Sequence, residues 1–296
     1  MYSVSERLQR VYQQSRRVIF DSSSKFIVMS DCHRGQGNMN DNFLQNQQVY
    51  FGALNHYLQA GFTYIELGDG DELWENRGIE PIIQAHSDVF WLLSRFYERG
   101  RLYLLYGNHD AVKGKKGFAA RSCSHYYCEA QGCCRPLFPG IEISEGLVLK
   151  NRESGQQILL THGHQGDWLN DRLWMAARFL VRYVWGPLEA VGFTEPTGSG
   201  RAREKREKVE SGLSAYAQIR RCLLIAGHTH RPAFSEPGRG RYFNAGSCVH
   251  PRCITGIEIE KGAISLVKWA VATRADQVLY VARERLGGPV PLFEYG

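Results

Sequence analysis

The sequence contains no run of about 18 apolar residues, the length that a helix needs to cross a bilayer. Residues 1–20 mix charged and apolar side chains at helical spacing, and they lack both the long apolar core and the small-residue cleavage site of a secretory signal. We therefore expect a cytoplasmic protein whose residues 1–24 form an N-terminal helical extension. Contact with a membrane, if any, would be transient and confined to its surface.

The sequence also lacks the dense cysteine pattern of a small disulfide-bonded protein, because its eight cysteines are scattered over 296 residues. Four of them, Cys123, Cys128, Cys133 and Cys134, lie close together. The two-residue spacing of a zinc knot is absent from this group, and no matched second pair follows it. We expect buried free thiols here, with structural zinc as the less favoured alternative.

The charge balance excludes little, because a net charge of +6 favours an anionic partner only weakly. The basic stretch at residues 201–208, RAREKREK, mixes cations with acids and has no aromatic side chain for base stacking. It is typical of a solvated helical face, so no specific nucleic-acid partner is predicted. A hydrophobic content of 43% and a charged content of 22% are those of a globular protein long enough for one large α/β domain.

Five short apolar runs recur along the chain, and each stops at a cluster of polar residues. Runs without strict alternation are typical of strands that are buried on both faces, and the stretches at 43–61 and 80–100 have the apolar spacing of the helices that cover them. This pattern predicts an α/β sheet with functional groups at strand ends. The runs are KFIVMSDCH (25–33), FTYIELGDGDELWE (62–75), RLYLLYGNHD (101–110), QILLTHGHQGD (157–167) and CLLIAGHTHRP (222–232).

Two parts of the chain depart from this plan. After Arg241 the apolar pieces alternate and are separated by turn residues, which predicts antiparallel strands. Residues 165–221 contain an amphipathic stretch, a Gly/Pro/Ser turn and a charged helical stretch, and we interpret them as a helical cap inserted into a core made of residues 25–164 and 222–296.

The amphipathic stretch of the predicted cap has an apolar stripe on one face and Arg178 and Arg182 one turn apart on another. Such a helix could hold an acyl chain on one side and a phosphate on the other. The more common role of an amphipathic helix is simply to pack onto the main domain, and that alternative stays open.

The polar clusters contain the side chains of a metal site. Residues i and i+2 of an extended chain point the same way, so Asp31 can converge with His33, and His228 with His230. Carboxylate, imidazole and amide oxygen ligands suit Mn, Fe, Co, Ni or Zn. Asp69 follows another strand, where its two oxygens could bridge two metals about 3.5–4 Å apart. Each cluster alone could instead cap a helix or serve a turn, but five together favour one shared site.

The ordered motifs D-x-H, G-D, G-N-H-D, H-G-H and G-H-T-H resemble those of the calcineurin-like metallophosphoesterase superfamily, from about residue 25 to 250 outside the predicted cap. The resemblance implies a four-layer α/β/β/α sandwich that holds two divalent metal ions, with manganese the first choice and iron, zinc, cobalt or nickel the alternatives. It assigns Asp31, His33 and His230 to the first metal, Asn108, His162 and His228 to the second, and Asp69 to the bridge.

The same resemblance implies a mechanism in which metal-bound hydroxide attacks phosphorus in line. His109 would then donate a hydrogen bond or a proton toward the leaving oxygen, and Asp110 would orient the imidazole. We expect Arg34 to offer its guanidinium to a phosphate, unless it is a solvated surface cation. His164 is expected to contact substrate or to support the metal ligands from behind.

The identity of the phosphoester is less constrained. The Asp-Arg pair of protein Ser/Thr phosphatases is missing after Gly68-Asp69, whereas Glu72 and Trp74 resemble the acid and tryptophan of the UDP-2,3-diacylglucosamine hydrolases. Those enzymes place arginine where this chain has His109. The sequence therefore predicts a hydrolase of a phosphodiester or pyrophosphate in a phosphorylated small molecule or lipid-linked substrate. A broad-specificity phosphodiesterase or phosphomonoesterase is the nearest alternative, and an inactive binding scaffold the more distant one.

Overall fold

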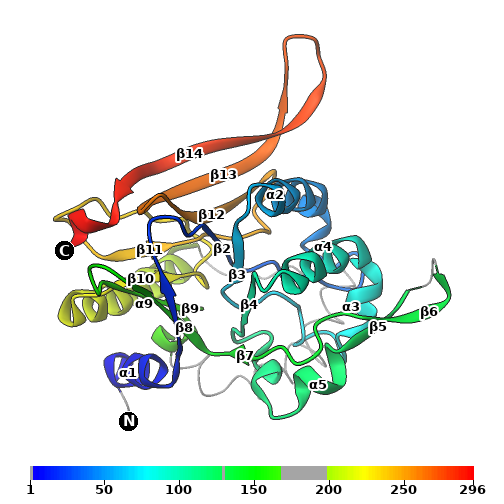
Figure 1. Ribbon diagram of the computed structural model, residues 1–296, viewed down its shortest axis with the longest axis horizontal. Coiled ribbons are helices and arrows are strands. Elements are labelled where there is room, and N and C mark those ends of the chain that lie inside the picture. The colour runs from blue at the N-terminus through cyan, green and yellow to red at the C-terminus, as the bar shows by residue number, and fades with distance from the viewer. Residues whose placement is uncertain (1–2, 129–130, 168–198) are drawn as a thin grey trace.

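The protein is built from two β-sheets packed face to face, with helices on both outer faces (Figure 1). The computed structural model describes residues 3–128, 131–167 and 199–296. Over these residues the predicted four-layer α/β/β/α architecture is confirmed. Within the described ranges, no helix combines the length and the apolar character needed to span a membrane.

The first sheet has seven strands in the order β14-β13-β12-β2-β3-β4-β7. Its parallel half contains β2 (Phe26–Met29), β3 (Thr63–Glu66), β4 (Leu102–Leu105) and β7 (Ile143–Ser144). Its antiparallel half contains β12 (Cys253–Glu260), β13 (Ala263–Thr273) and β14 (Leu279–Pro291). The strands predicted from the first three apolar runs, and the antiparallel strands predicted after residue 252, are confirmed.

The second sheet has five strands in the order β1-β8-β9-β10-β11. They are β1 (Arg16–Phe20), β8 (Gly146–Asn151), β9 (Gln157–Thr161), β10 (Leu223–Ala226) and β11 (Tyr242–Asn244). Strand β11 runs parallel to β10, so residues 242–244 do not belong to the antiparallel strands expected there. Residues 16–20 were expected to be part of a helical extension, but they form an edge strand that pairs with β8, and only α1 (Val4–Gln14) is helical.

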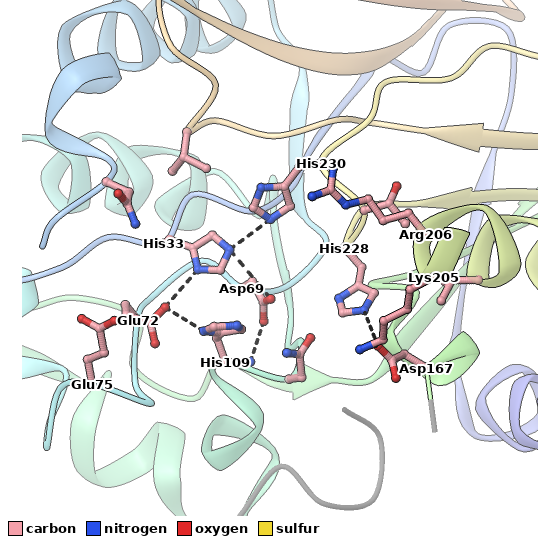
Figure 2. A pocket seen from close by; sticks show the side chains of 15 residues that line it. His33, Asp69, Glu72, Glu75, His109, Asp167, Lys205, Arg206, His228 and His230 are labelled. Atoms are coloured by element: carbon pink, nitrogen blue, oxygen red, sulfur yellow. Dashed lines mark hydrogen bonds and ion pairs between the residues drawn. The ribbon is translucent and has the colours of Figure 1, made fainter. Parts of the chain in front are cut away.

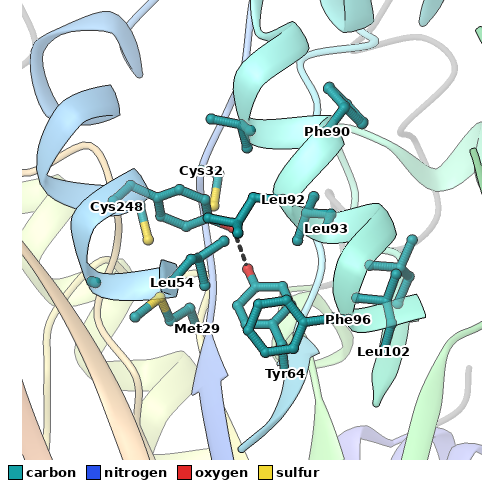
Figure 3. Close-up of a cluster of buried hydrophobic side chains, with 14 of the residues drawn as sticks. Met29, Cys32, Leu54, Tyr64, Phe90, Leu92, Leu93, Phe96, Leu102 and Cys248 are labelled. Carbon is teal, nitrogen blue, oxygen red and sulfur yellow. Dashed lines mark hydrogen bonds between the residues drawn. The ribbon is translucent and has the colours of Figure 1, made fainter. Parts of the chain in front are cut away.

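Side chains on the central strands of the first sheet point alternately to its two faces, so a separate apolar core forms on each face. Val28, Ile65 and Leu105 point into the space between the sheets, where they pack with Leu149 and Ile225 of the second sheet. The opposite face of the first sheet packs on α2 (Gln47–Gln59), α3 (Glu80–Ala85) and α4 (Ser87–Glu98). Figure 3 shows buried side chains of α2 and α4 in this core. Burying both faces explains why these strands have continuous apolar runs.

Helix α9 (Ser199–Arg220) covers the outer face of the second sheet together with α1. Its Leu213, Tyr216 and Ala217 are at most 1% exposed and pack against strands β8, β9 and β10. Residues 199–220 therefore belong to a layer of the sandwich, although the sequence placed them in the cap. Residues 168–198 lie outside the described part of the chain, as do Arg178 and Arg182, so the remainder of the cap and the domain division stay predictions.

The cysteine cluster lies around the hairpin formed by β5 (His125–Cys128) and β6 (Cys133–Pro136), which follows α5 (Phe118–Ser122). All eight cysteines are free thiols. Cys123 is buried as expected, but Cys133 and Cys134 are exposed, so the expectation of buried thiols fails for this pair. Across residues 3–128, 131–167 and 199–296, the groups that could hold a metal contain no cysteine.

Candidate metal centre

The polar clusters that follow five strands meet at one place between the two sheets (Figure 2). Asp31 and His33 follow β2, Asp69 follows β3, and Asn108 follows β4 in the first sheet. His162 follows β9 and the pair His228 and His230 follows β10 in the second sheet. The carboxyl ends of β2, β3, β4, β9 and β10 therefore supply all seven side chains that the sequence proposes as ligands.

Asp31, His33 and His230 form the first group, with one ligand atom from each lying within 4.8 Å of the others. Nε2 of His230 is 3.0 Å from Oδ1 of Asp31, and Nε2 of His33 is 3.7 Å from the same oxygen. The two imidazole nitrogens approach to 3.3 Å. These three donors can face a single cation.

Asp69, His162 and His228 form the second group, again within 4.8 Å. Oδ2 of Asp69 is 3.0 Å from Nε2 of His162 and 3.9 Å from Nε2 of His33, which belongs to the first group. The Asp69 carboxylate therefore lies between the two groups, as a bridging ligand must.

Several buried polar atoms at this point have no hydrogen-bond partner. They are Oδ1 of Asn108 and Nδ1 of His162, while Oδ1 of Asp31 and Nε2 of His162 have only the 3.0 Å approaches of His230 and Asp69 described above, without hydrogen-bond geometry. An unsatisfied buried polar atom costs about 1–3 kcal/mol, so a group of them is rare in a native protein. A cation would satisfy them, and the mixture of oxygen and nitrogen donors suits divalent transition metals. The residues present thus fit a pair of divalent metal ions.

The backbone of the predicted ligands is unusual as well. Asp31, His33, Asp69, His228 and His230 have positive φ angles between 48° and 67°, a region that residues other than glycine rarely adopt. They are five of the nine such residues in the described chain. Strained backbone of this kind concentrates at functional sites, because the side chains must be aimed at a point that a regular strand ending would not reach.

Two motif glycines allow β3 and β4 to end close together. A Cβ on Gly68, whose φ is +102°, would lie 2.4 Å from the backbone nitrogen of Gly107. A Cβ on Gly107 would lie 2.2 Å from Oδ1 of Asp69. Both approaches exclude a side chain. The glycines of G-D and G-N-H-D therefore bring Asp69 and Asn108 into one site.

Electrostatics keep the ligand carboxylates ionised. Burial alone would raise the pKa of Asp31, but the imidazoles of His230 and His162 hold it well below its usual range. The pKa of Asp69 is likewise lowered, by His162 and His109. Against its own burial, His162 has a pKa raised to about 9 by Asp69 and Asp31. Metal binding at His162 must therefore displace a proton.

Glu72, and not Asp110, holds the His109 imidazole. Oε2 of Glu72 lies 2.7 Å from Nδ1 of His109, and the ring of Trp74 stacks on the imidazole at 4.0 Å. Burial would lower the pKa of His109, but Glu72 and Asp69 raise it above the ordinary value. The orienting role expected of Asp110 thus falls to Glu72. The motif GD..E.W indicates that Glu72 belongs to the site, but the spacing of the sequence does not show whether Glu72 or Asp110 reaches the His109 ring.

Asp110 instead fastens the loops that present the ligands. Its carboxylate accepts hydrogen bonds from the backbone nitrogens of Gly107 at 2.7 Å, Asp69 at 3.2 Å and Gly70 at 3.1 Å. The ammonium of Lys113 lies 2.6 Å from Oδ2. Asp110 therefore ties the end of β3 to the end of β4.

We predict that Asp110→Asn lowers the free energy of unfolding by about 1–3 kcal/mol, because an amide nitrogen replaces one acceptor of these bonds. Urea unfolding beside Asp276→Asn, which removes an exposed carboxylate of the β13–β14 turn, measures the difference. Unchanged stability together with a lost turnover would instead support the sequence expectation that Asp110 acts through His109.

Two other expected substrate contacts are not in the cavity. Arg34 is 1% exposed, and its guanidinium is occupied by Glu66 and Asp71, so it is neither a phosphate contact nor a surface cation. His164 is 4% exposed and lies behind His162, with 5.6 Å between ring centroids. Burial chiefly holds the pKa of His164 well below its usual range, so its imidazole is neutral. Its placement fits the supporting alternative better than a substrate contact.

The ligand groups open into a cavity of about 400 Å³ whose lining includes residues that the sequence did not indicate (Figure 2). Lys205 and Arg206 of α9 form a cationic wall beside His228. Nζ of Lys205 is 2.7 Å from Oδ2 of Asp167, and that oxygen is 3.9 Å from Nε2 of His228. The stretch at 201–208 was interpreted as solvated, and nothing in its composition distinguishes the two cations that face the cavity.

The fold and the site define a protein of the metallophosphoesterase class: a four-layer sandwich whose described residues carry three overlapping His/Asp groups at the strand ends, the third being His33, Asp69 and His109. Residues 24–232 match the calcineurin-like phosphoesterase family, and the chain belongs to this family. No curated protein sequence matches the chain.

Solved structures that resemble the protein include Vps29 from Chaetomium thermophilum, with 10% sequence identity and a TM-score of 0.40 over 90% of this chain and 96% of that chain. A single mutant of Vps29 from Entamoeba histolytica has 16% identity and a TM-score of 0.38 over 89% of this chain and 99% of that chain.

Proposed function

We propose that the protein is a dinuclear metal-dependent phosphohydrolase that cleaves a phosphodiester or pyrophosphate bond. The observation that carries this proposal is the Asp69 carboxylate, which lies between two groups of imidazole and carboxylate donors. Divalent ions bound there would supply the Lewis acidity that activates water and neutralises charge on phosphate oxygens. Asp31, His33 and His230 would hold one ion, Asn108, His162 and His228 the other.

The protein's own residues would position the substrate and move a proton. His109 lines the cavity and uses Nδ1 to bind Glu72, which leaves Nε2 to donate toward the leaving oxygen. Arg206 places positive charge in the cavity lining, beside Lys205 that is paired with Asp167, and a second phosphate of a pyrophosphate could lie there. The cavity is roomy enough for a nucleotide-sized group next to the metals.

A nucleotide-linked pyrophosphate such as UDP-2,3-diacylglucosamine is the substrate that we favour. The resemblance of Glu72 and Trp74 to the acid and tryptophan of GD..E.W in the UDP-2,3-diacylglucosamine hydrolases supports it, while His109, where they have arginine, is the departure. Manganese as the native metal, a cytoplasmic location and a cap within residues 165–198 belong to the same proposal.

A panel of phosphoesters tests the proposal on purified protein stripped with a chelator and reloaded with Mn²⁺. We expect UDP-diacylglucosamine, nucleotide pyrophosphates or bis(p-nitrophenyl) phosphate to turn over at least about tenfold faster than phosphomonoesters, a difference of about 1.4 kcal/mol in barrier. Comparable rates on monoesters and cyclic nucleotides would indicate the broad-specificity alternative. Metal binding without turnover of any compound would indicate a binding scaffold.

A further inference from the structure

One carboxylate oxygen is shared by two imidazoles of the centre. Oε2 of Glu72 lies 3.0 Å from Nδ1 of His33 and 2.7 Å from Nδ1 of His109, as Figure 2 shows. His33 is a proposed metal ligand, whereas His109 faces the leaving oxygen in the proposed mechanism. Through one oxygen Glu72 therefore contacts both imidazoles at Nδ1, whereas Asp69 reaches Nε2 of His33 and the backbone nitrogen of His109.

The geometry fixes the protonation of both rings at Nδ1. An ionised carboxylate only accepts hydrogen bonds, so each Nδ1 that faces Oε2 must carry the hydrogen. For His33 this leaves Nε2 toward Asp31 and His230, where loss of its proton gives the tautomer that a metal ligand requires. For His109 it leaves Nε2 toward the cavity.

The Glu72 side chain is itself held in place. Its other oxygen, Oε1, accepts a hydrogen bond from the backbone nitrogen of Trp74 at 3.1 Å, and the side chain is 9% exposed. The indole of Trp74 stacks on His109 with an interplanar angle of 18° and donates from Nε1 to the carbonyl of Asn108 at 2.6 Å. Both carboxylate oxygens of Glu72 therefore accept hydrogen bonds, and a donor group in place of either oxygen would lose them.

We propose that Glu72 is a positioning residue that couples occupancy of the Asp31/His33/His230 metal site to the orientation of His109. The proposal deepens the proposed function, on which its catalytic half rests. His33 would hold the cation through Nε2, and a cation there would restrain the ring, Oε2 of Glu72 that accepts from it, and the imidazole of His109 that shares this oxygen. The metal half of the proposal is independent of which substrate is cleaved.

Glu72→Gln tests the shared acceptor at nearly constant volume. If the amide oxygen of the variant took the place of Oε2, the amide hydrogens would face the backbone N–H of Trp74; in the reverse orientation they would face both imidazoles. Either way an acceptor is lost, and we expect the affinity for the first Mn²⁺ and kcat at saturating Mn²⁺ each to fall by about 10–100-fold. Glu98→Gln, which removes an exposed carboxylate from α4, is the control.

A double-mutant cycle separates coupling from general damage. In a His109→Ala background at saturating Mn²⁺, Glu72→Gln should change kcat by less than about twofold, because its target ring is gone. The loss of Mn²⁺ affinity should persist there, since His33 is still present. Equal kcat losses in both backgrounds would overturn the coupling.

Histidine ring ¹⁵N NMR on the metal-free wild type needs neither a variant nor turnover. We expect both rings to carry hydrogen on Nδ1, alone where the ring is neutral and together with Nε2 where it is protonated, and addition of Zn²⁺ as a diamagnetic probe to shift His109 signals in the wild type but not in Glu72→Gln. Nε2–H tautomers at both rings would overturn the inference even if the enzyme is active. An inactive wild type with the expected tautomers would contradict only the proposed function.

Discussion

Replacing Asp69 by asparagine should lower kcat/KM for phosphodiester hydrolysis by about a thousandfold, which corresponds to about 4 kcal/mol of transition-state stabilisation. Oδ2 of Asp69 lies 3.0 Å from Nε2 of His162 and 3.9 Å from Nε2 of His33, so it serves both donor groups. Asparagine keeps the shape but removes the negative charge that lets one side chain hold two cations. The measurement is steady-state kinetics together with metal content by mass spectrometry.

The metal content gives the sharper readout. We expect the wild type to retain about two Mn²⁺ per chain and Asp69→Asn about one. Without the Asp69 carboxylate, the first group still has the charge of Asp31, whereas the second group has only neutral donors. Asp276→Asn removes the same charge at the distant β13–β14 turn and should retain both ions. A folded Asp69→Asn protein with two ions and activity within about tenfold of the wild type would refute the bridge.

The proposed ligand set could be assembled from the sequence because its chemistry leaves local traces. Asp31 and His33, like His228 and His230, come in pairs after an apolar strand, although their positive φ angles, and not the alternation of an extended strand, aim both side chains at one point. The strands themselves are recognisable because both faces are buried. The contacts around the ligands are harder to predict from the sequence. Arg34 and His109 each follow a ligand, but the carboxylates that bind them, Glu66 and Glu72, lie on another segment of the chain. Such contacts depend on register between strands, and no spacing within one segment encodes them.

The errors in the fold have a similar origin. Strand β1 follows α1 almost without a loop, so its five residues were absorbed into the predicted helical extension. Its partner β8 lies more than a hundred residues later, and only that pairing makes residues 16–20 a strand. Helix α9 begins with exposed charges, and its buried Leu213 and Tyr216 come in the second half. Because the first half is charged, the whole segment was interpreted as part of a cap and not as a helix that packs on the sheet.

The second large effect is expected at Arg34, whose replacement by methionine should lower the free energy of unfolding by about 3–5 kcal/mol. Its guanidinium donates two hydrogen bonds of 2.8 Å to the carboxylate of Glu66 and one of 2.7 Å to Asp71, and all three side chains are at most 2% exposed. Lys113 completes the network at 2.6 Å from Asp71. Removing Arg34 leaves Glu66 buried without its cation, which costs more than the packing that methionine restores.

Thermal and urea unfolding measure this loss, and a chain of this size should melt about 10 °C lower. Adding Glu66→Gln should recover part of the stability, because the uncompensated charge is then removed along with its partner. Arg34→Lys should also destabilise, since an ammonium cannot reproduce the paired bonds to Glu66. If Arg34 bound a phosphate as the motif order suggests, Arg34→Met would raise KM and leave the unfolding transition in place. That result would mean that the Arg34–Glu66 pair contributes little to the fold, and that the guanidinium turns into the cavity during turnover.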